Sequence, residues 1–398
     1  MNWAKKEAKK ETLLYNQRRE KVTLSFSPLV RIPLDEESDF IQEELYQNSN
    51  FVHLRNSKIL YYDCTNYYFE IESEDGMKKY GKSKEHRPNP IVTMGLFMDA
   101  DGIPLSFDLY PGNKNEQLTL KPLETKVIRD FNCSEFIFCS DAGLGSKGSR
   151  FFNSFGNRSY VITYSLKKMK KEERERALLP TQFKIPGSDK FIDISALDET
   201  DPTVYNTVYY KDKARKGKNP NDPYRFIQKT AVTNDGQIAQ KQVYQLDKER
   251  IREEARYDGF YAVITNLEGD VREIININKR RWEIEENFRI MKTEFEARPV
   301  FVRRQDSIKA HFLTCYISLL VYRLLEKKLG EEFTCNEILK TLREMNMTLL
   351  SKDSGYIPSY KRTKLTDALH TSFPFRTDYE FLSKADMRGI IKETKQKK

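Results

Sequence analysis

The sequence predicts an α/β protein, built on a mixed β-sheet with flanking helices and interrupted by a mostly β insertion. Strand-like and helix-like segments alternate through the first 166 residues, which is typical of an α/β sheet. An Asp-Gly pair at 101–102 separates two apolar runs and indicates a β-hairpin. Region 167–258 then holds charge runs and short alternating strands, and longer apolar patterns resume after it.

The expected elements of the first half follow from their apolar spacing. They are a short amphipathic helix at 37–48, a strand at 57–70, a hairpin at 91–111, a helix at 116–131, a strand at 136–141, a short helix at 146–155 and a strand at 159–166. Three antiparallel strands followed by helix-linked parallel ones is the order of a ribonuclease H-like core. Residues 2–22 are expected to form a charged, exposed helix or an unordered arm.

The second half is expected to return to the core after the insertion. The expected strands are 191–197, 203–211, 225–233 and 241–246 within the insertion and 259–267 after it, followed by helices at 272–294 and 307–328. The predicted organisation is an N-terminal charged or helical segment (1–56), a first core part (57–166), the insertion (167–258), a second core part with the long helix (259–330), and a C-terminal helical segment with a polar tail (331–398).

Composition narrows the class of protein. The 68 basic and 59 acidic residues give a net charge of +9, which suits a polyanion such as nucleic acid but also fits an ordinary basic protein. Five scattered cysteines without CxxC spacing favour reduced thiols in the cytosol, and four widely spaced histidines argue against a His-based zinc site. No apolar run approaches the ~20 residues of a membrane span and no signal-peptide core follows the N-terminus, so we expect a cytoplasmic protein.

Two aspartates stand out as candidate catalytic or metal-binding residues. Asp63 lies in the middle of an aromatic strand, where a carboxylate is costly unless it is paired or binds a cation. Asp141 ends a short apolar strand, and the carboxyl ends of strands in α/β sheets commonly hold ligands. Each also has an ordinary explanation: backbone amides or an arginine could satisfy Asp63, and an aspartate before Ala-Gly is common in turns.

The long helix at 272–294 supplies a third candidate acid. Arg281, Glu285 and Lys292 are spaced by four and seven residues, so on a regular helix they share one face. Trp282 and Phe288 are expected to pack that helix on the sheet. The ordinary explanation is a solvated face with an ion pair between Arg281 and Glu285.

Together, Asp63, Asp141 and Glu285 form a predicted triad of hard oxygen ligands. Mg²⁺ prefers such ligands and keeps open positions for phosphate oxygens and water. Two such ions about 4 Å apart can activate an attacking hydroxyl and stabilise the leaving oxygen of an in-line displacement. Carboxylates this close would raise one another's pKa without a cation between them. The pattern therefore predicts a metal-dependent phosphoryl-transfer site.

The same residues resemble the DDE transposases of bacterial insertion sequences, in the group whose third acid lies in the motif Y-x2-R-x3-E-x6-K. Here the motif reads Asn278, Arg281, Glu285 and Lys292, so Asn278 replaces the usual tyrosine. The segments YYDCTNYYFE around Asp63, FCSDAGLGS around Asp141 and PGNKNE at 111–116 also resemble that family. The resemblance runs from about 57 to 325 and includes a long β insertion before the glutamate.

The resemblance implies a DNA transposase. Asp63, Asp141 and Glu285 would hold two Mg²⁺ ions, for which Mn²⁺ can substitute. Water would cut DNA at the ends of the element, and the freed 3′-OH would attack target DNA. The expected partners are double-stranded DNA and a second copy of the chain, which pairs two DNA ends, with no membrane involved. The expected location is the bacterial cytoplasm, in association with the nucleoid.

Five residues are candidates for DNA contact. The resemblance implies that Arg281 and Lys292 lie beside Glu285 and bind phosphates. Lys82, Lys84 and Arg87, with His86 between them, form a basic cluster that reads equally as a phosphate-binding loop or a solvated loop. The charge runs at 167–171 and 211–218 are further candidates, with the same ordinary explanation.

Three alternatives stay open. A junction resolvase or another ribonuclease H-like nuclease would share the metal chemistry but not the R-x3-E-x6-K helix. A catalytically retired, transposase-derived DNA-binding protein would bind DNA without requiring Mg²⁺. A structural oligomerisation protein would leave Asp63 unexplained. Only 62 residues precede Asp63, without a clear helix-turn-helix, so a truncated copy that keeps the active site but fails to find specific ends is also an expectation.

Overall fold

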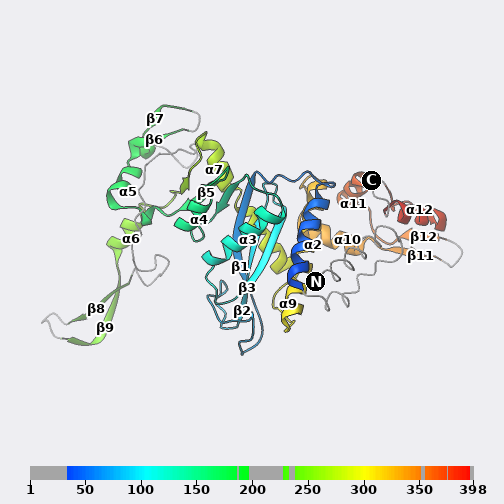
Figure 1. Cartoon of the computed structure of the whole chain (residues 1–398), viewed down its shortest axis with the longest axis horizontal. Coiled ribbons are helices and arrows are strands. Elements are labelled where there is room, and N and C mark those ends of the chain that lie inside the picture. Colours follow the sequence, from blue (N-terminus) through cyan, green and yellow to red (C-terminus); the bar gives the residue numbers. More distant parts are fainter. Residues whose placement is uncertain are drawn as a thin grey trace. The chain divides into compact units, whose positions relative to one another are not determined.

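The computed structural model describes residues 34–185, 188–196, 227–232, 238–350, 355–373 and 375–394 (Figure 1). The chain divides into two compact units. The first unit comprises Met1–Cys133 and Trp282–Lys398, and the second comprises Ser134–Arg281. The predicted arm at 2–22 lies outside the described residues.

The first unit is built on three antiparallel strands. These are β1 (Ile59–Tyr68), β2 (Ile91–Met98) and β3 (Pro104–Pro111). Every residue of β2 is buried, because β2 pairs with β1 on one side and with β3 on the other. The helix α3 (Gln117–Asp130) packs on β2 and β3. The predicted strand, hairpin and helix of this region are thereby confirmed.

A buried ion pair supports the turn between β2 and β3. Asp99 Oδ1 accepts hydrogen bonds from the backbone N–H groups of Asp101 and Ile103, each at 3.0 Å, and Gly102 completes the turn with φ of +81°. Arg55 Nε donates to Asp99 Oδ2 at 2.5 Å, and both side chains are fully buried. The remaining guanidinium nitrogens of Arg55 donate to Ser49 Oγ and to two backbone carbonyls on and next to β3. The hydrogen bonds and the ion pair of Arg55 therefore fix the turn of the hairpin.

Two helices cover β3 in the first unit. α2 (Leu34–Ser49) and α9 (Gln305–Lys328) pack against β3 and against each other. Tyr316 of α9 donates its hydroxyl to the Leu105 carbonyl at 2.8 Å, and Gln42 of α2 accepts from the Phe107 N–H at 2.8 Å. α9 is long and apolar enough to cross a membrane, but half of its most apolar window is buried inside the protein. We therefore assign α9 as a core helix.

A small antiparallel sheet ends the first unit. β11 (Met347–Leu349), β12 (Gly355–Pro358) and β13 (Leu382–Ser383) pair in that order. The helices around it are α10 (Cys335–Glu344), α11 (Lys364–Ser372) and α12 (Lys384–Thr394). We expected only helices and a polar tail here, since strands of two to four residues carry too little alternation to be recognised in a sequence.

The second unit holds three further strands. β4 (Ile137–Ser140) and β5 (Ser159–Tyr164) are parallel, and β10 (Ala262–Thr265) pairs antiparallel with β5. The strand order of the whole sheet is β10-β5-β4-β1-β2-β3. α4 (Lys147–Phe152) and α7 (Val271–Lys279) accompany these strands, and α7 packs on β4 and β5. The mixed sheet with flanking helices confirms the predicted α/β, ribonuclease H-like fold class.

The described part of the insertion, between β5 and β10, contains both strands and helices. Two hairpins are formed by β6 (Phe183–Lys184) with β7 (Phe191–Ile192) and by β8 (Ile227–Val232) with β9 (Ile238–Leu246). α5 (Lys171–Ala177) and α6 (Lys248–Ala255) were not expected. The predicted strand at 203–211 and the basic run at 211–218 lie outside the described residues.

Removal of the Arg55 charge should destabilise the protein severely. In Arg55→Met, Asp99 keeps its buried carboxylate but loses its counter-ion, so we expect the free energy of unfolding to fall by about 3–5 kcal/mol. Urea denaturation followed by circular dichroism measures this change. Arg362→Met, which breaks the exposed pair with Asp367, is the matched control and should cost less than about 1 kcal/mol. Equal effects of the two substitutions would contradict the role assigned to Arg55.

Candidate active site

Asp63 is a half-buried carboxylate in an otherwise buried strand. Its neighbours Tyr62 and Cys64 are fully buried, and their aromatic and apolar surfaces explain why this segment forms a central strand. Asp63 Oδ1 accepts the backbone N–H of Cys64 at 2.7 Å. Because side chains alternate along a strand, Asp63, Thr65 and Tyr67 share one face of β1.

Lys292 lies over that same face of β1. Its Nζ donates to Thr65 Oγ1 at 2.7 Å and stands 5.3 Å from the centre of the Tyr67 ring. Burial lowers the pKa of Lys292 to about 8, with a further decrease from the charge of Lys84 and an opposing increase from Asp63. The carboxylate of Asp63 and the ammonium of Lys292 therefore act on each other within the first unit.

The predicted single helix at 272–294 is wrong. α7 ends at Lys279, Arg280 and Arg281 form a turn, and α8 (Trp282–Arg289) begins a new helix. α8 continues into a π-helical turn, Ile290–Glu294, where the Phe295 N–H donates to the Ile290 carbonyl. This wider turn keeps Ile290 and Met291 buried together. Arg281 and Lys292 thus lie outside the regular helix, so regular helical spacing does not place them on one face with Glu285.

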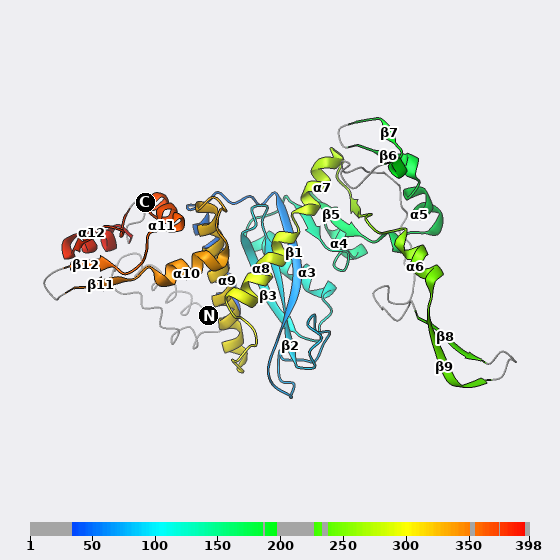
Figure 2. The same cartoon turned by 180° about the vertical axis from the view of Figure 1, so that it is seen from behind.

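α8 presents Glu285 to solvent while its opposite side is anchored. Ile284, Asn287 and Phe288 are buried, and α8 packs on β1 (Figure 2). The packing role expected for Phe288 is confirmed, but that of Trp282 is wrong, because Trp282 is 60% exposed. Trp282 is the first residue of α8, and the buried residues of this helix begin only at Ile284.

Asn287 is a positioning residue that the sequence interpretation missed. Its Nδ2 donates to the Gly102 carbonyl at 3.1 Å, and its Oδ1 accepts from Arg323 Nε of α9 at 2.6 Å. A fully buried asparagine on the side of α8 opposite the candidate catalytic glutamate indicates that the helix is held in a defined position. The sequence did carry a signal for this residue, because Asn287 is polar at a position that the helical pattern places on the buried side.

In the second unit, Asp141 directly follows β4. Its Oδ1 accepts the Leu144 N–H at 2.9 Å, and a Cβ on Gly143 would lie 3.3 Å from both carboxylate oxygens. The side chain therefore caps a tight turn, as its ordinary explanation expects, and stands at the carboxyl end of a strand, as the catalytic one expects. Asn278 of α7 accepts a hydrogen bond from Thr163 Oγ1 of β5 at 2.9 Å, so this substitute for the motif tyrosine ties α7 to the sheet.

Arg281, which closes the second unit, is half-buried. Its charge opposes the effect of burial, which raises the pKa of the Cys139 thiol on β4 to about 12. Arg281 therefore lies near the strand that ends at Asp141.

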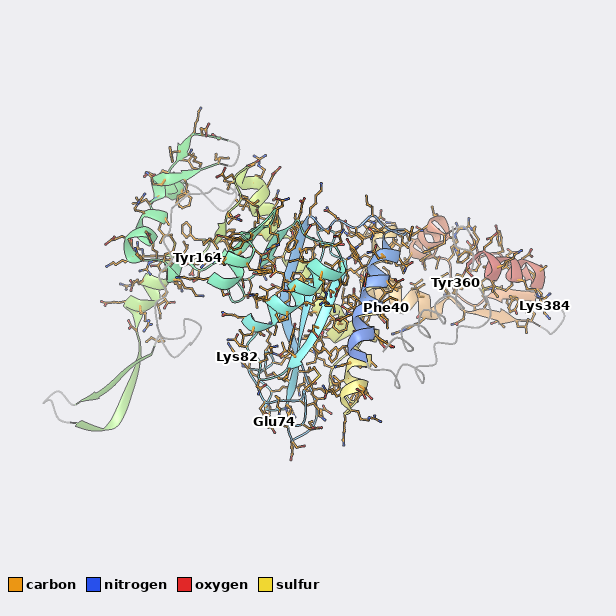
Figure 3. All side chains as sticks on the ribbon, in the orientation of Figure 1. Phe40, Glu74, Lys82, Tyr164, Tyr360 and Lys384 are labelled. Atoms are coloured by element: carbon orange, nitrogen blue, oxygen red, sulfur yellow. The ribbon has the colours of Figure 1, made fainter. Side chains whose placement is uncertain are left out.

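The basic cluster at 82–87 lies along the second half of β1. Asn66 clamps it: Asn66 Nδ2 donates to the Lys82 carbonyl and Oδ1 accepts the Lys84 N–H, both at 3.1 Å. The ammonium of Lys84 donates to the Cys64 carbonyl, next to Asp63, and Arg87 stacks over the Tyr68 ring at 4.2 Å. Lys82 is exposed on this loop (Figure 3). The loop thus brings cations to the strand that carries Asp63.

The basic run at 167–171 shows a different pattern. Lys167 Nζ pairs with Glu254 of α6 at 2.7 Å and lies 5.7 Å from the Tyr257 ring. Lys171 begins α5. Lys167 therefore joins two segments of the insertion through an ion pair, which favours a structural role for this lysine.

The three predicted carboxylates are suited to a divalent metal by their chemistry. Asp63 on β1 and Glu285 on α8 belong to the first unit, and Asp141 after β4 belongs to the second. Their oxygens are the hard ligands that Mg²⁺ prefers. Within the described ranges, no group of three or more His, Cys, Asp or Glu side chains is gathered as a metal site.

Comparison with known families identifies one match. The model of the transposase DDE domain matches residues 69–321, well over half of the chain. The matched range contains Asp141, Glu285 and Lys292 and begins just after Asp63. No curated protein matches the chain.

Two solved structures are similar over part of their length. A piggyBac transposase synaptic complex with hairpin DNA is 8% identical, with a TM-score of 0.40, and the alignment covers 79% of this chain and 56% of that one. A Mos1 transposase paired-end complex with the left transposon end is 13% identical, with a TM-score of 0.19, covering 38% and 48%. The chain therefore spans about half the length of these two proteins, and the fold assignment rests on its own strand order.

Loss of the Asn66 clamp should release the basic loop. In Asn66→Ala the Lys82 carbonyl and the Lys84 N–H lose a buried partner, which costs about 1–3 kcal/mol, so the loop should open about five-fold to a hundred-fold more often. Limited trypsin digestion of the native protein, followed by mass spectrometry, measures cleavage after Lys82 and Lys84. Asn89→Ala removes only one 3.5 Å bond to Ile71 and serves as the control. Equal cleavage in all three proteins would exclude the clamp.

Proposed function

Because the chain belongs to the transposase DDE domain family, we propose that it cuts DNA at the ends of an insertion sequence and joins the freed ends to target DNA. Asp63, Asp141 and Glu285 are the proposed catalytic and metal-binding residues. The observation that carries this proposal is the half-buried Asp63 in the aromatic strand β1, with Lys292 and Lys84 beside it. A carboxylate in such a strand has a high desolvation cost, and a site that binds cations and phosphates explains it.

The carboxylates would hold two Mg²⁺ ions, with Mn²⁺ as a substitute. When bound, such ions supply Lewis acidity to the phosphate and lower the pKa of water. The chain's own contribution is to place three oxygen ligands on rigid elements: a central strand, the end of a second strand and an anchored helix. Asn287 supports this role, since it fixes α8 and with it the position of Glu285.

Five cations are proposed to bind the DNA backbone. Two of them, Arg281 and Lys292, come from the motif that carries Glu285, and the other three, Lys82, Lys84 and Arg87, lie on the clamped loop beside β1. Their support differs. Lys292 and Lys84 reach polar atoms of β1 next to Asp63, whereas Arg87 stacks on Tyr68 and Lys82 is exposed. A phosphate near Asp63 would meet the first two, and an extended duplex would meet the others.

The proposed partners are double-stranded DNA, at the ends of the element and at the target, and a second copy of the chain. Joining two ends requires two active sites, so a homodimer on DNA is the simplest assembly. The proposed location is the bacterial cytoplasm, on the nucleoid. The buried state of all five cysteines as free thiols supports a reducing compartment.

A second candidate function is a transposase-derived protein that binds DNA without cutting it. It is favoured by the cations beside β1, which lie in the first unit and could bind DNA without a metal. Such a protein would keep the basic loop and Lys292 in use and would gain nothing from Glu285. Cleavage assays separate the two candidates.

Nicking of supercoiled plasmid should depend on the triad and on metal. With Mg²⁺ or Mn²⁺ the wild-type protein should convert supercoiled to nicked DNA, and EDTA should stop the reaction. Glu285→Ala should reduce the rate by at least about a hundred-fold, because a ligand to the reacting centre is removed. Asp63→Asn and Asp141→Asn should do the same. Agarose gels of a time course give the rates.

The matched control for Glu285 lies on the same helix. Glu286→Ala removes a neighbouring carboxylate that pairs with Arg289 at 2.7 Å, and it should leave nicking within about two-fold of wild type. Absence of nicking by all proteins, with DNA binding intact, would reject the catalytic proposal in favour of the second candidate. Metal-dependent nicking that survives Glu285→Ala would reject the assignment of the third acid.

Lys292 should bind a DNA phosphate directly. Lys292→Gln is expected to weaken binding of a duplex of arbitrary sequence and to reduce the slope of log affinity against log salt by about 1, the value for one lost phosphate contact. Fluorescence anisotropy in EDTA measures binding apart from cleavage. Lys327→Gln on α9, where the lysine pairs with Glu331, is the control and should leave the slope unchanged. An unchanged slope in Lys292→Gln would remove this residue from the interface.

A further inference from the structure

Glu85 is an acidic residue in the middle of the basic loop, and its side chain faces the cations beside β1. Glu85 Oε1 accepts a hydrogen bond from Arg298 Nη1 and lies 3.5 Å from Lys292 Nζ. The carboxylate is 21% exposed, so water and solutes reach it. One carboxylate oxygen therefore serves two cations from another part of the chain.

Backbone contacts position the segments that carry Glu85, Lys292 and Arg298. The loop that carries Glu85 is clamped by Asn66, and Lys292 lies in the π-helical turn that follows α8. Arg298 is fixed by the segment around it: the Ala297 N–H donates to the Met291 carbonyl, and the Val300 N–H donates to the Tyr68 carbonyl at 2.9 Å. The segments that carry Lys292 and Arg298 are thus held by their own backbone contacts, and the two cations meet at Glu85 Oε1.

The arrangement has the chemistry of a phosphate site. A guanidinium and an ammonium that converge on one oxygen match the charged oxygens of a phosphodiester as well as those of a carboxylate. Lys84 donates its ammonium to the Cys64 carbonyl of β1 and adds a third positive charge nearby. Glu85 is the carboxylate that faces both Arg298 and Lys292. Lys84 has its own partner, because Glu116 lies 3.7 Å from its Nζ.

We propose that Arg298 and Lys292 form a binding site for one phosphodiester of a DNA strand, and that Glu85 occupies this site until DNA displaces it. The inference rests on the DNA-processing function proposed above and assigns Arg298 and Glu85 to it. Glu85 then acts as a competitor. It satisfies the two cations in the free protein, and it weakens binding of any DNA that cannot displace it.

A purely structural ion pair is the alternative. In that case Glu85 would stabilise the fold, and its removal would leave two cations without their partner and would not tighten DNA binding. Only the first explanation predicts a gain in DNA affinity when the Glu85 charge is removed. Whether the affinity rises is therefore the deciding measurement.

The test is DNA binding by the full chain in EDTA, with a 20-base-pair duplex of arbitrary sequence and fluorescence anisotropy at several salt concentrations. Glu85→Gln should bind about five-fold more tightly than wild type, because the competing charge is lost while the shape is kept. Arg298→Gln should bind more weakly, with a salt slope smaller by about 1. In the Arg298→Gln background, Glu85→Gln should gain less than about two-fold, since the two residues share one site.

Glu74→Gln is the matched control, because it makes the same change in net charge between β1 and β2 but breaks a pair with Lys79 instead (Figure 3). It should change affinity by less than about two-fold, and thermal unfolding should show that all variants are folded. Wild-type binding without a gain in Glu85→Gln, or an equal gain in Glu74→Gln, would overturn this inference alone. No DNA binding by any variant would overturn it together with the proposed function.

Discussion

The buried side chain of Asn287 is the contact on which the candidate site depends most. It joins α8 to the turn between β2 and β3 through Gly102 and to α9 through Arg323. That turn is itself held by the Arg55–Asp99 pair, so a chain of polar contacts runs from α2 through the hairpin to α8 and α9. These side chains are buried and hydrogen-bond to one another, which makes the arrangement rigid, although Nη2 of Arg323 is buried without a hydrogen-bond partner. The height of Glu285 above β1 follows from this network.

A second constraint comes from β1. The strand must be buried to hold the sheet together, yet it carries Asp63 and is approached by Lys84 and Lys292. Desolvation acts on every charge placed there, as the lowered pKa of Lys292 shows. The strand reconciles these demands by alternation: one face holds Asp63 and Thr65, and the other packs Tyr62 and Cys64 against α3 through Thr119.

Most of the core could be predicted because its elements are long and strongly patterned. The aromatic strand around Asp63, the hairpin around Asp99 and the apolar helix α9 each carry several turns or repeats of one period. The break at Arg280 and the π-helical turn at Lys292 could not be predicted, since both depend on tertiary packing and leave the local pattern helical.

Long-range polar contacts were also outside the reach of the sequence. Asn66, Asn287 and Glu85 gain their meaning only from partners far along the chain, and no spacing rule connects them. The exposed Trp282 shows the same limit in reverse, because an aromatic residue at a helical apolar position was expected to be buried. The two aspartates, by contrast, could be singled out from the sequence. Asp63 interrupts an aromatic strand, and Asp141 directly follows a short apolar one.

The discontinuity of the first unit has a consequence for biosynthesis. Its strands β1 to β3 leave the ribosome early, but α8 and α9, which cover them, follow only after the whole second unit, Ser134–Arg281, has been made. At about 5–20 residues per second, this interval of about 150 residues lasts roughly 7 to 30 s. During that time the aromatic face of β1 and the apolar face of β3 have no helix from the C-terminal half to cover them. Apolar surface exposed in this way makes a folding intermediate prone to aggregation, so the order of synthesis puts the burden of early stability on the contacts within β1 to β3 and α3.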